Sequence, residues 1–207
     1  MREERVYIKN NELMIEGLLH KSSADCGAVI CHPHSLMGGS MHNNVVEAIR
    51  DAFAAENYTT LRFNFRGVGG STGRYDEGRG EQEDILAVCQ YLQNIDIGQL
   101  SFAGYSFGAW VGSKVIAQPD NPFAAVLFIA PPINYFDFDF GKLKCKINMI
   151  ICGNNDQFCN LKILQEQAKY LDAHLKIIPG TDHFYAGREN ELINILRGSL
   201  HNPQKSN

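Results

Sequence analysis

The chain lacks the features that mark several large classes of protein. Lys and Arg number 19 against 23 Asp and Glu, the formal net charge is -4 at pH 7, and both signs are scattered along the sequence. A basic face that could neutralise a phosphate backbone is therefore not expected, and nucleic acid is an unexpected partner. No apolar run is long enough to cross a bilayer, and residues 1–10 are charged and polar where a secretory signal has an apolar core. These absences predict a cytoplasmic protein without a membrane association.

The cysteines do not follow the pattern of a zinc site or of a redox motif. None of the six has the paired close spacing that such sites require. Cys31, Cys89 and Cys152 lie inside apolar stretches, where a free cysteine behaves as a small hydrophobic residue. We therefore expect buried free thiols and a reducing environment.

Strand and helix patterns alternate along the whole chain. The 207 residues contain no internal repeat and no linker, which predicts one domain over residues 1–207. Parallel strands need crossover connections, so this alternation predicts an α/β fold with a mainly parallel sheet and helices on both faces. The predicted strands cover residues 12–20, 27–32, 58–65, 100–105, 124–130, 147–152 and 175–178. The predicted helices cover residues 43–56, with Asn43 as the N-cap, and residues 81–93, 107–117, 161–171 and 191–200; the tail after His201 is expected to fray.

A Gly-Tyr-Ser-Phe-Gly sequence stands at residues 104–108, where a predicted strand runs directly into a predicted helix. Small residues two positions before and after Ser106 allow the backbone to close a sharp turn that presents the hydroxyl above the sheet. The Phe107 N–H at the start of the helix could then donate to an oxyanion. The motif predicts Ser106 as a nucleophile.

A serine nucleophile needs a base, and the base needs a partner that holds its tautomer. Asp156 follows the strand predicted at 147–152, and His183 follows the last predicted strand, so both belong at the edge where open α/β sheets build their sites. Taken singly, Asp156 could be a turn former and His183 an exposed loop residue. Together with Ser106 they follow the order Ser, Asp, His, which predicts a catalytic triad. Asp182 is not expected to take part, because adjacent residues rarely face each other well.

The loop that follows the strand at 27–32 is expected to supply the second oxyanion donor. Pro33 has no N–H, so His34 is favoured, with Ser35 and Leu36 as alternatives. His32 and His34 alternate near His42, yet no carboxylate or cysteine completes a metal site locally, and none is predicted.

The glycine-rich segment at 66–81 matches neither a P-loop nor a dinucleotide fingerprint. A local network of ion pairs and turns that braces the loop is favoured over substrate binding. The charged residues of this expected network are Arg66, Arg74, Asp76, Glu77 and Arg79.

Five segments carry a resemblance to a known family: HPHSLMGGSMHNNVV, LRFNFRGVGGSTGRYDEGRGE, GYSFG, the loop around Asp156 and GTDHFYAGR. With these in the family's order, nearly the whole chain resembles the compact bacterial α/β hydrolases related to dienelactone hydrolase. The resemblance implies a triad of Ser106, Asp156 and His183 and no cofactor. The nucleophile is Ser where dienelactone hydrolases have Cys, so lactone specificity is not implied. Only residues 131–146 separate two predicted strands where many enzymes of this fold insert a cap, and no helical cap is expected.

The expected activity is that of a carboxylesterase for short to medium acyl esters, acting through an acyl-enzyme on a small-molecule substrate. A thioesterase or peptidase with the same triad stays open, as does a non-catalytic binding protein on the same fold. A homodimer also stays open. The residues expected to line the substrate site are Leu36, Tyr105, Tyr135 and Phe136, although the aromatic segment at 135–140 could equally be a loop that packs on the core.

Overall fold

A single twisted sheet runs through the centre of the computed structural model, which describes residues 2–201. Within these residues, eight strands pair in the order β1-β2-β4-β3-β5-β6-β7-β8. The pairs β1/β2 and β2/β4 are antiparallel, and every pair from β4 to β8 is parallel. The strands are β1 (Glu4–Asn10), β2 (Leu13–His20), β3 (Cys26–Cys31), β4 (Thr59–Phe63), β5 (Gln99–Tyr105), β6 (Phe123–Ile129), β7 (Met149–Gly153) and β8 (His174–Ile178).

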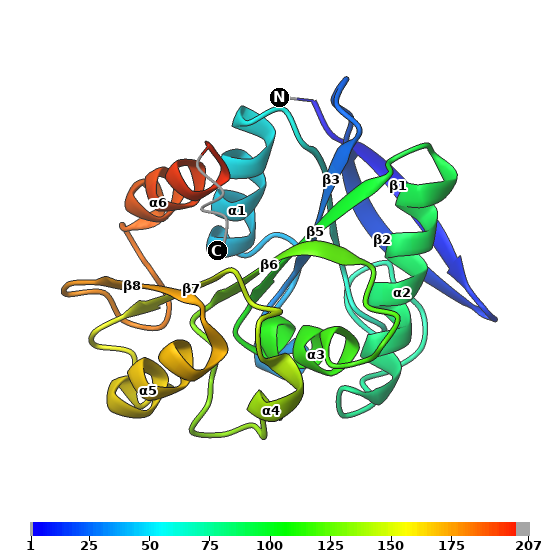
Figure 1. The fold of residues 1–207 in the computed structure, drawn as a ribbon. Helices are drawn as coiled ribbons and strands as arrows, with labels where there is room; N and C mark the ends of the chain where they lie inside the picture. The colour runs from blue at the N-terminus through cyan, green and yellow to red at the C-terminus, as the bar shows by residue number, and fades with distance from the viewer. Residues whose placement is uncertain (1, 202–207) are drawn as a thin grey trace.

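Helices cover both faces of this sheet (Figure 1). The helices are η1 (Ser35–Met37), α1 (Asn44–Ala55), α2 (Arg79–Asn94), α3 (Phe107–Ile116), α4 (Phe140–Leu143), α5 (Leu161–Leu171) and α6 (Glu189–His201). Helices α1 and α6 pack together on one face and form one apolar core with the sheet. Helices α2, α3 and α5 contribute to a second core on the opposite face. The predicted mainly parallel sheet between two helical layers is confirmed.

The predicted elements occur in the predicted order, with ends that differ by a few residues. Strands β4 and β7 are buried along their whole length, as expected for parallel strands covered on both faces. Asn43 caps α1 as predicted, because its side chain accepts a hydrogen bond from the Val45 N–H at 2.9 Å. Residues after His201 lie outside the described part of the chain, so the predicted frayed tail is not described.

Strand β1 and the short helices η1 and α4 were not among the predicted elements. Residues 4–10 form an antiparallel edge strand against β2, with Ile8 and Asn10 as its buried members. Charged residues suit an edge strand, because one of its faces and its outer side remain in water. The apolar alternation that identifies an inner strand is therefore weak in this segment.

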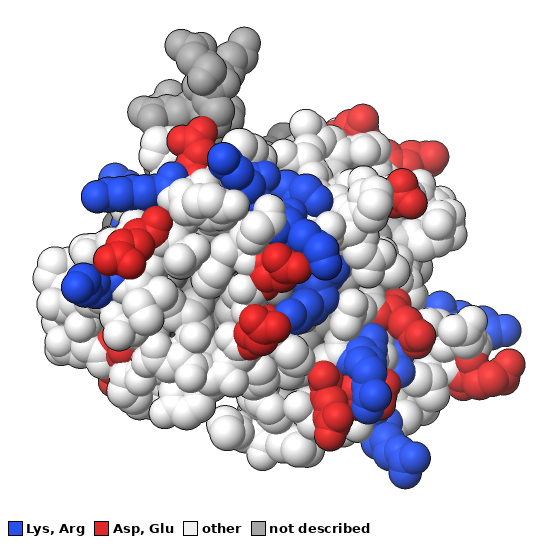
Figure 2. All heavy atoms as spheres, turned by 60° about the horizontal axis from the view of Figure 1, so that its bottom comes forward, with Lys and Arg blue, Asp and Glu red and all other residues white. Residues whose placement is uncertain are grey.

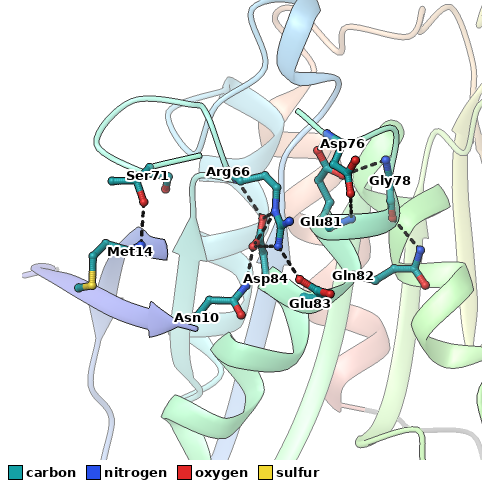
Figure 3. Close-up of polar contacts among 12 residues, drawn as sticks. Asn10, Met14, Arg66, Ser71, Asp76, Gly78, Glu81, Gln82, Glu83 and Asp84 are labelled. Atoms are coloured by element: carbon teal, nitrogen blue, oxygen red, sulfur yellow. Dashed lines mark hydrogen bonds and ion pairs between the residues drawn. The ribbon is translucent and has the colours of Figure 1, made fainter. Parts of the chain in front are cut away.

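The loop after β4 is braced by an ion-pair network around a carboxylate from α2 (Figure 3). Asp84 is fully buried and accepts hydrogen bonds from the Arg66 backbone N–H at 2.9 Å and from the Arg66 guanidinium at 2.8 Å. Asn10 of β1 donates to the same carboxylate at 2.8 Å. Buried charges require such pairing. The predicted bracing role of Arg66 is confirmed, and Asp84 is a partner that the loop sequence did not reveal.

The rest of this loop closes onto the start of α2. Glu81 accepts hydrogen bonds from the backbone N–H groups of Asp76 at 2.9 Å and Gly78 at 2.8 Å, and Figure 3 shows these contacts. Arg79 lies 3.8 Å from Asp76 and 3.3 Å from Glu77. These contacts confirm that Asp76, Glu77 and Arg79 belong to the local network.

Acidic and basic side chains are interspersed on the face of the molecule shown in Figure 2. Oppositely charged groups lie side by side there, which matches the scattering of both signs along the sequence. Among residues 2–201, no helix combines the length and the apolarity that a membrane span requires.

Candidate active site

Ser106 occupies a strained turn between β5 and α3. Its backbone has φ 54° and ψ -117°, a conformation that non-glycine residues rarely adopt. The turn is held on both sides, because the Ser106 N–H donates to Ile129 O at 2.9 Å and its carbonyl accepts from the Ala109 N–H at 2.9 Å. The residue is only 8% exposed. The strand-to-helix position predicted for this serine is thus the one observed.

Two glycines make this turn possible. A Cβ atom on Gly104 would lie 2.7 Å from the Ala109 backbone nitrogen, and one on Gly108 would lie 2.7 Å from the carbonyl oxygen of Cys31 in β3. Both neighbours are backbone atoms that cannot rotate away. The glycines therefore allow α3 to begin close against β3 and β5.

Gly108→Ala is expected to lower the free energy of unfolding by about 1–3 kcal/mol, because the new methyl group overpacks the contact with Cys31. The measurement is urea denaturation. Gly198→Ala is the matched control: nothing lies within 4 Å of its Cβ position in α6, and alanine should stabilise this helix by about 0.5–1 kcal/mol. Equal stability of Gly108→Ala and the wild type would contradict the packing argument.

A continuous chain of hydrogen bonds joins Ser106, His183 and Asp156. His183 Nε2 lies 2.9 Å from Ser106 Oγ, and His183 Nδ1 lies 2.8 Å from Asp156 Oδ2. The other carboxylate oxygen of Asp156 accepts from the Phe158 N–H at 2.8 Å. Ser106, His183 and Asp156 are all buried. With the proton on Nδ1, the imidazole has its Nε2 lone pair directed at the serine hydroxyl.

The loops that carry Asp156 and His183 are tied to each other. The Asn155 N–H donates to Thr181 O at 2.9 Å, and the Gly180 N–H donates to the Asn154 side chain at 2.6 Å. Asp182 takes a different role, because its carboxylate accepts from the backbone N–H groups of Phe184 and Tyr185 at 2.9 and 3.2 Å. The prediction that Asp182 is not the partner of the imidazole agrees with these contacts.

A thiol also approaches the carboxylate of Asp156. The Cys152 thiol lies 3.7 Å from Asp156 Oδ2, and a hydrogen bond with the neighbouring Cys159, together with burial, raises the pKa of Cys152. The Cys152 thiol therefore stays protonated and can donate weakly to the same oxygen that faces His183. The predicted burial of Cys31, Cys89 and Cys152 is confirmed, and all six cysteines are free.

Tyr105 does not lie in the wall of the substrate site, where it was predicted from the sequence. The residue is only 2% exposed, and its side chain packs in the core between the sheet and the layer of α1 and α6. Its hydroxyl donates to the backbone carbonyl of His183 at 2.8 Å. Residues alternate between the faces of a strand, and Tyr105 lies on the face of β5 that α1 and α6 cover. The assignment of Tyr105 to the substrate wall is therefore corrected to an interior contact.

The two predicted oxyanion donors lie next to each other. The His34 and Phe107 rings are 4.7 Å apart. Phe107 is the first residue of α3, so its N–H has no acceptor within the helix. In the loop after β3, Leu36 N–H donates to His34 Nδ1 at 3.2 Å and Met37 N–H donates to His34 O at 3.0 Å. The Leu36 N–H is therefore already used in a hydrogen bond. The N–H groups of His34 and Ser35 remain as candidates for the second oxyanion donor.

Aromatic side chains lie next to Phe107 and next to His183. Phe136 packs against Trp110 at 4.5 Å and Phe107 at 5.9 Å. Tyr135 is 66% exposed and contacts Phe158, whose ring lies 4.5 Å from His183. Leu36 is 72% exposed.

Several neighbours of the site were missed by the sequence reasoning. Trp110 and Tyr75 pack on Phe107, and Phe158 and Phe184 pack on His183. Phe158 and Phe184 stand within two positions of Asp156 and His183, so their proximity in sequence was an available signal. Tyr75 comes from the loop after β4 and gave no such signal.

His32 is a structural residue below the loop after β3. Its Nδ1 lies 2.6 Å from Pro33 O, its Nε2 accepts from the Phe65 N–H at 3.0 Å, and burial lowers its pKa to about 4. The imidazole is therefore neutral at physiological pH and fully used by backbone groups. Among residues 2–201, no three His, Cys, Asp or Glu side chains gather as a metal site would require.

Comparisons with known proteins place the chain among relatives of the same architecture. No family model matches it. The uncharacterised protein RP471 of Rickettsia prowazekii is 35% identical over 213 aligned positions, and the match covers 95% of this chain and 88% of the relative. The structure of an α-β serine hydrolase homologue from Coxiella burnetii has a TM-score of 0.88 and 31% identity, and the match covers 97% of this chain and 98% of that one. The chain belongs to the α/β serine hydrolase family.

A further similar structure is that of a hydrolase without a lid. XC6422 from Xanthomonas campestris, described as an α/β serine hydrolase without a lid, matches with a TM-score of 0.87 and 26% identity over 100% of this chain and 97% of that one. In the present hydrolase, only the four-residue helix α4 lies between β6 and β7, where a cap would be inserted. The predicted membership of the lidless α/β hydrolases is confirmed, and the link to dienelactone hydrolase stays a prediction.

Proposed function

We propose that this hydrolase is a carboxylesterase in which Ser106 is the nucleophile, His183 the general base and Asp156 the residue that orients the base. The observation that carries the proposal is the unbroken relay of 2.9 and 2.8 Å from the serine hydroxyl to the carboxylate. Its members stand on loops that follow β5, β7 and β8, at the carboxyl edge of the sheet.

In the proposed reaction, His183 Nε2 takes the proton of Ser106 Oγ as the oxygen attacks the ester carbonyl carbon. The Asp156 carboxylate accepts the hydrogen bond from Nδ1 and stabilises the imidazolium that forms. The N–H groups of Phe107 and His34 hold the carbonyl oxygen as it becomes negative. The imidazolium then protonates the departing alcohol, which leaves an acyl-Ser106. A water molecule, deprotonated by His183, then attacks this ester, and the imidazolium returns the proton to Ser106 Oγ as the carboxylic acid departs.

The substrate class is proposed from the surroundings of Ser106. Leu36 and Tyr135 are exposed, and Phe136 packs on Phe107 next to Ser106 in the sequence, so all three are available for apolar contacts with an acyl or alcohol group. A neutral ester of a small molecule fits these contacts. The six free cysteines support a reducing compartment, and we propose the cytoplasm.

The test of the proposal is labelling of the folded protein by a fluorophosphonate, together with hydrolysis of a panel of p-nitrophenyl esters, thioesters and peptide amides. An activated serine reacts with the probe, and a carboxylesterase turns over the esters fastest. Preference for thioesters or amides would assign the triad to those reactions instead. A folded protein that neither labels nor hydrolyses any member of the panel would be a binding protein on the hydrolase fold.

Acyl chain length gives a more detailed expectation. Burial of each CH2 contributes about 0.8 kcal/mol, so a deep apolar tunnel would raise kcat/KM roughly fourfold with every added carbon. Without a cap, the apolar wall ends early, and kcat/KM should level off or fall as the acyl chain lengthens. The measurement is kcat/KM for p-nitrophenyl esters from acetate to palmitate. A rise that continues to palmitate would contradict a shallow site.

A further inference from the structure

Tyr105 connects the nucleophile to the loop of the base through the interior of the protein. It is the last residue of β5 and directly precedes Ser106. Its ring lies in the core formed with α1 and α6, 5.5 Å from the ring of His183, and its hydroxyl donates to the His183 carbonyl at 2.8 Å. A rigid aromatic ring therefore spans the distance between the backbone of the nucleophile and the backbone of the base.

Other hydrogen bonds described for the loop around His183 are made by its neighbours Phe184 and Tyr185. Asp182 holds the backbone N–H groups of Phe184 and Tyr185, and Asn44 of α1 donates to Phe184 O at 3.1 Å. Among residues 2–201, Tyr105 is the group that donates to the carbonyl of His183 itself. The hydroxyl bond thus acts on the residue whose imidazole must meet Ser106.

We propose that Tyr105 is a positioning residue that sets the separation of Ser106 and His183, an inference that rests on the proposed function. Burial, together with the charges of Asp156 and Asp182, raises the pKa of Tyr105, so its hydroxyl remains a donor. Loss of the hydroxyl leaves a buried carbonyl without its donor, and such a group moves toward water or another donor. The imidazole attached to that backbone then leaves its 2.9 Å contact with Ser106 Oγ.

Tyr105→Phe removes the hydroxyl and keeps the ring. We expect kcat to fall about fivefold to tenfold, the equivalent of one net hydrogen bond, with little change in KM. Fluorophosphonate labelling of Ser106 should slow by a similar factor. Amide hydrogen exchange at Phe184 and Tyr185 should accelerate, and this readout does not depend on turnover.

Tyr185→Phe is the matched control. Tyr185 is buried in the same core, and its hydroxyl donates to Ile151 O at 3.3 Å. That carbonyl also accepts from the Ala130 N–H at 2.8 Å, so it keeps a donor when the hydroxyl is removed. This variant should lose some stability, as Tyr105→Phe does, while its kcat stays near that of the wild type.

The outcomes separate this inference from the proposed function. Labelling of the wild type that Ser106→Ala abolishes establishes the serine chemistry first, and a wild type that never labels would refute that chemistry. Given an active wild type, an unchanged kcat in Tyr105→Phe, or an equal loss of kcat in both tyrosine variants, would overturn the positioning role. Faster exchange at Phe184 and a lower kcat in Tyr105→Phe alone would support it.

Discussion

Ser106→Ala is expected to lower kcat/KM for p-nitrophenyl acetate by about 10⁴- to 10⁶-fold and to abolish fluorophosphonate labelling. The hydroxyl is the atom that would form the acyl-enzyme, and alanine offers His183 no proton to take. The residual rate reflects whatever stabilisation the oxyanion donors provide to attack by water. Alanine removes one oxygen and adds nothing, so the protein should remain folded.

Ser113→Ala is the control for this experiment. Ser113 is a buried serine on α3, and its hydroxyl donates to Trp110 O at 2.6 Å. It has no contact with His183 in the described structure. Its replacement should leave kcat/KM within about twofold of the wild type, because the Ser113 hydroxyl is bonded within α3 and not to Ser106 or His183. Full activity in Ser106→Ala would refute the proposed nucleophile.

Asp156→Asn is expected to lower kcat by about 10³- to 10⁴-fold while the fold is kept. One side-chain oxygen of Asp156 accepts from the Phe158 N–H, so the amide oxygen of the variant should take that place. Its NH2 group would then face His183 Nδ1 and donate to it. The imidazole proton would move to Nε2, where it points at Ser106 and prevents that nitrogen from acting as a base. The measurement is kcat for the preferred ester.

Asp182→Asn provides the comparison on a neighbouring carboxylate. The Asp182 oxygen that accepts from Phe184 and Tyr185 N–H can be replaced by an amide oxygen with the same contacts. Most of the activity should therefore survive. A larger loss in Asp182→Asn than in Asp156→Asn would reverse the assignment of the orienting acid.

The order of strands and helices was predictable because each element carries its own local pattern. Apolar runs such as 124–130 are typical of buried parallel strands, and amphipathic spacing predicted α5 with the same ends as observed. The Gly-x-Ser-x-Gly turn was equally local, since its glycines and its serine are consecutive. Strand β1 was not predicted, because the charged residues that suit the edge of a sheet weaken the apolar alternation that identifies a strand.

The interior contacts of the site were decided by packing between distant segments. Tyr105 and His183 are 78 positions apart, and nothing in the sequence around Tyr105 shows that its hydroxyl would reach that carbonyl. The pairing of Arg66 with Asp84 likewise depends on how α2 lies against β4. Local propensity and turn chemistry act over a few residues, so they determine which elements form and place Ser106, Asp156 and His183 on their loops. Which side chains then meet depends on the order of the strands and the faces their residues occupy, and these are properties of the assembled sheet.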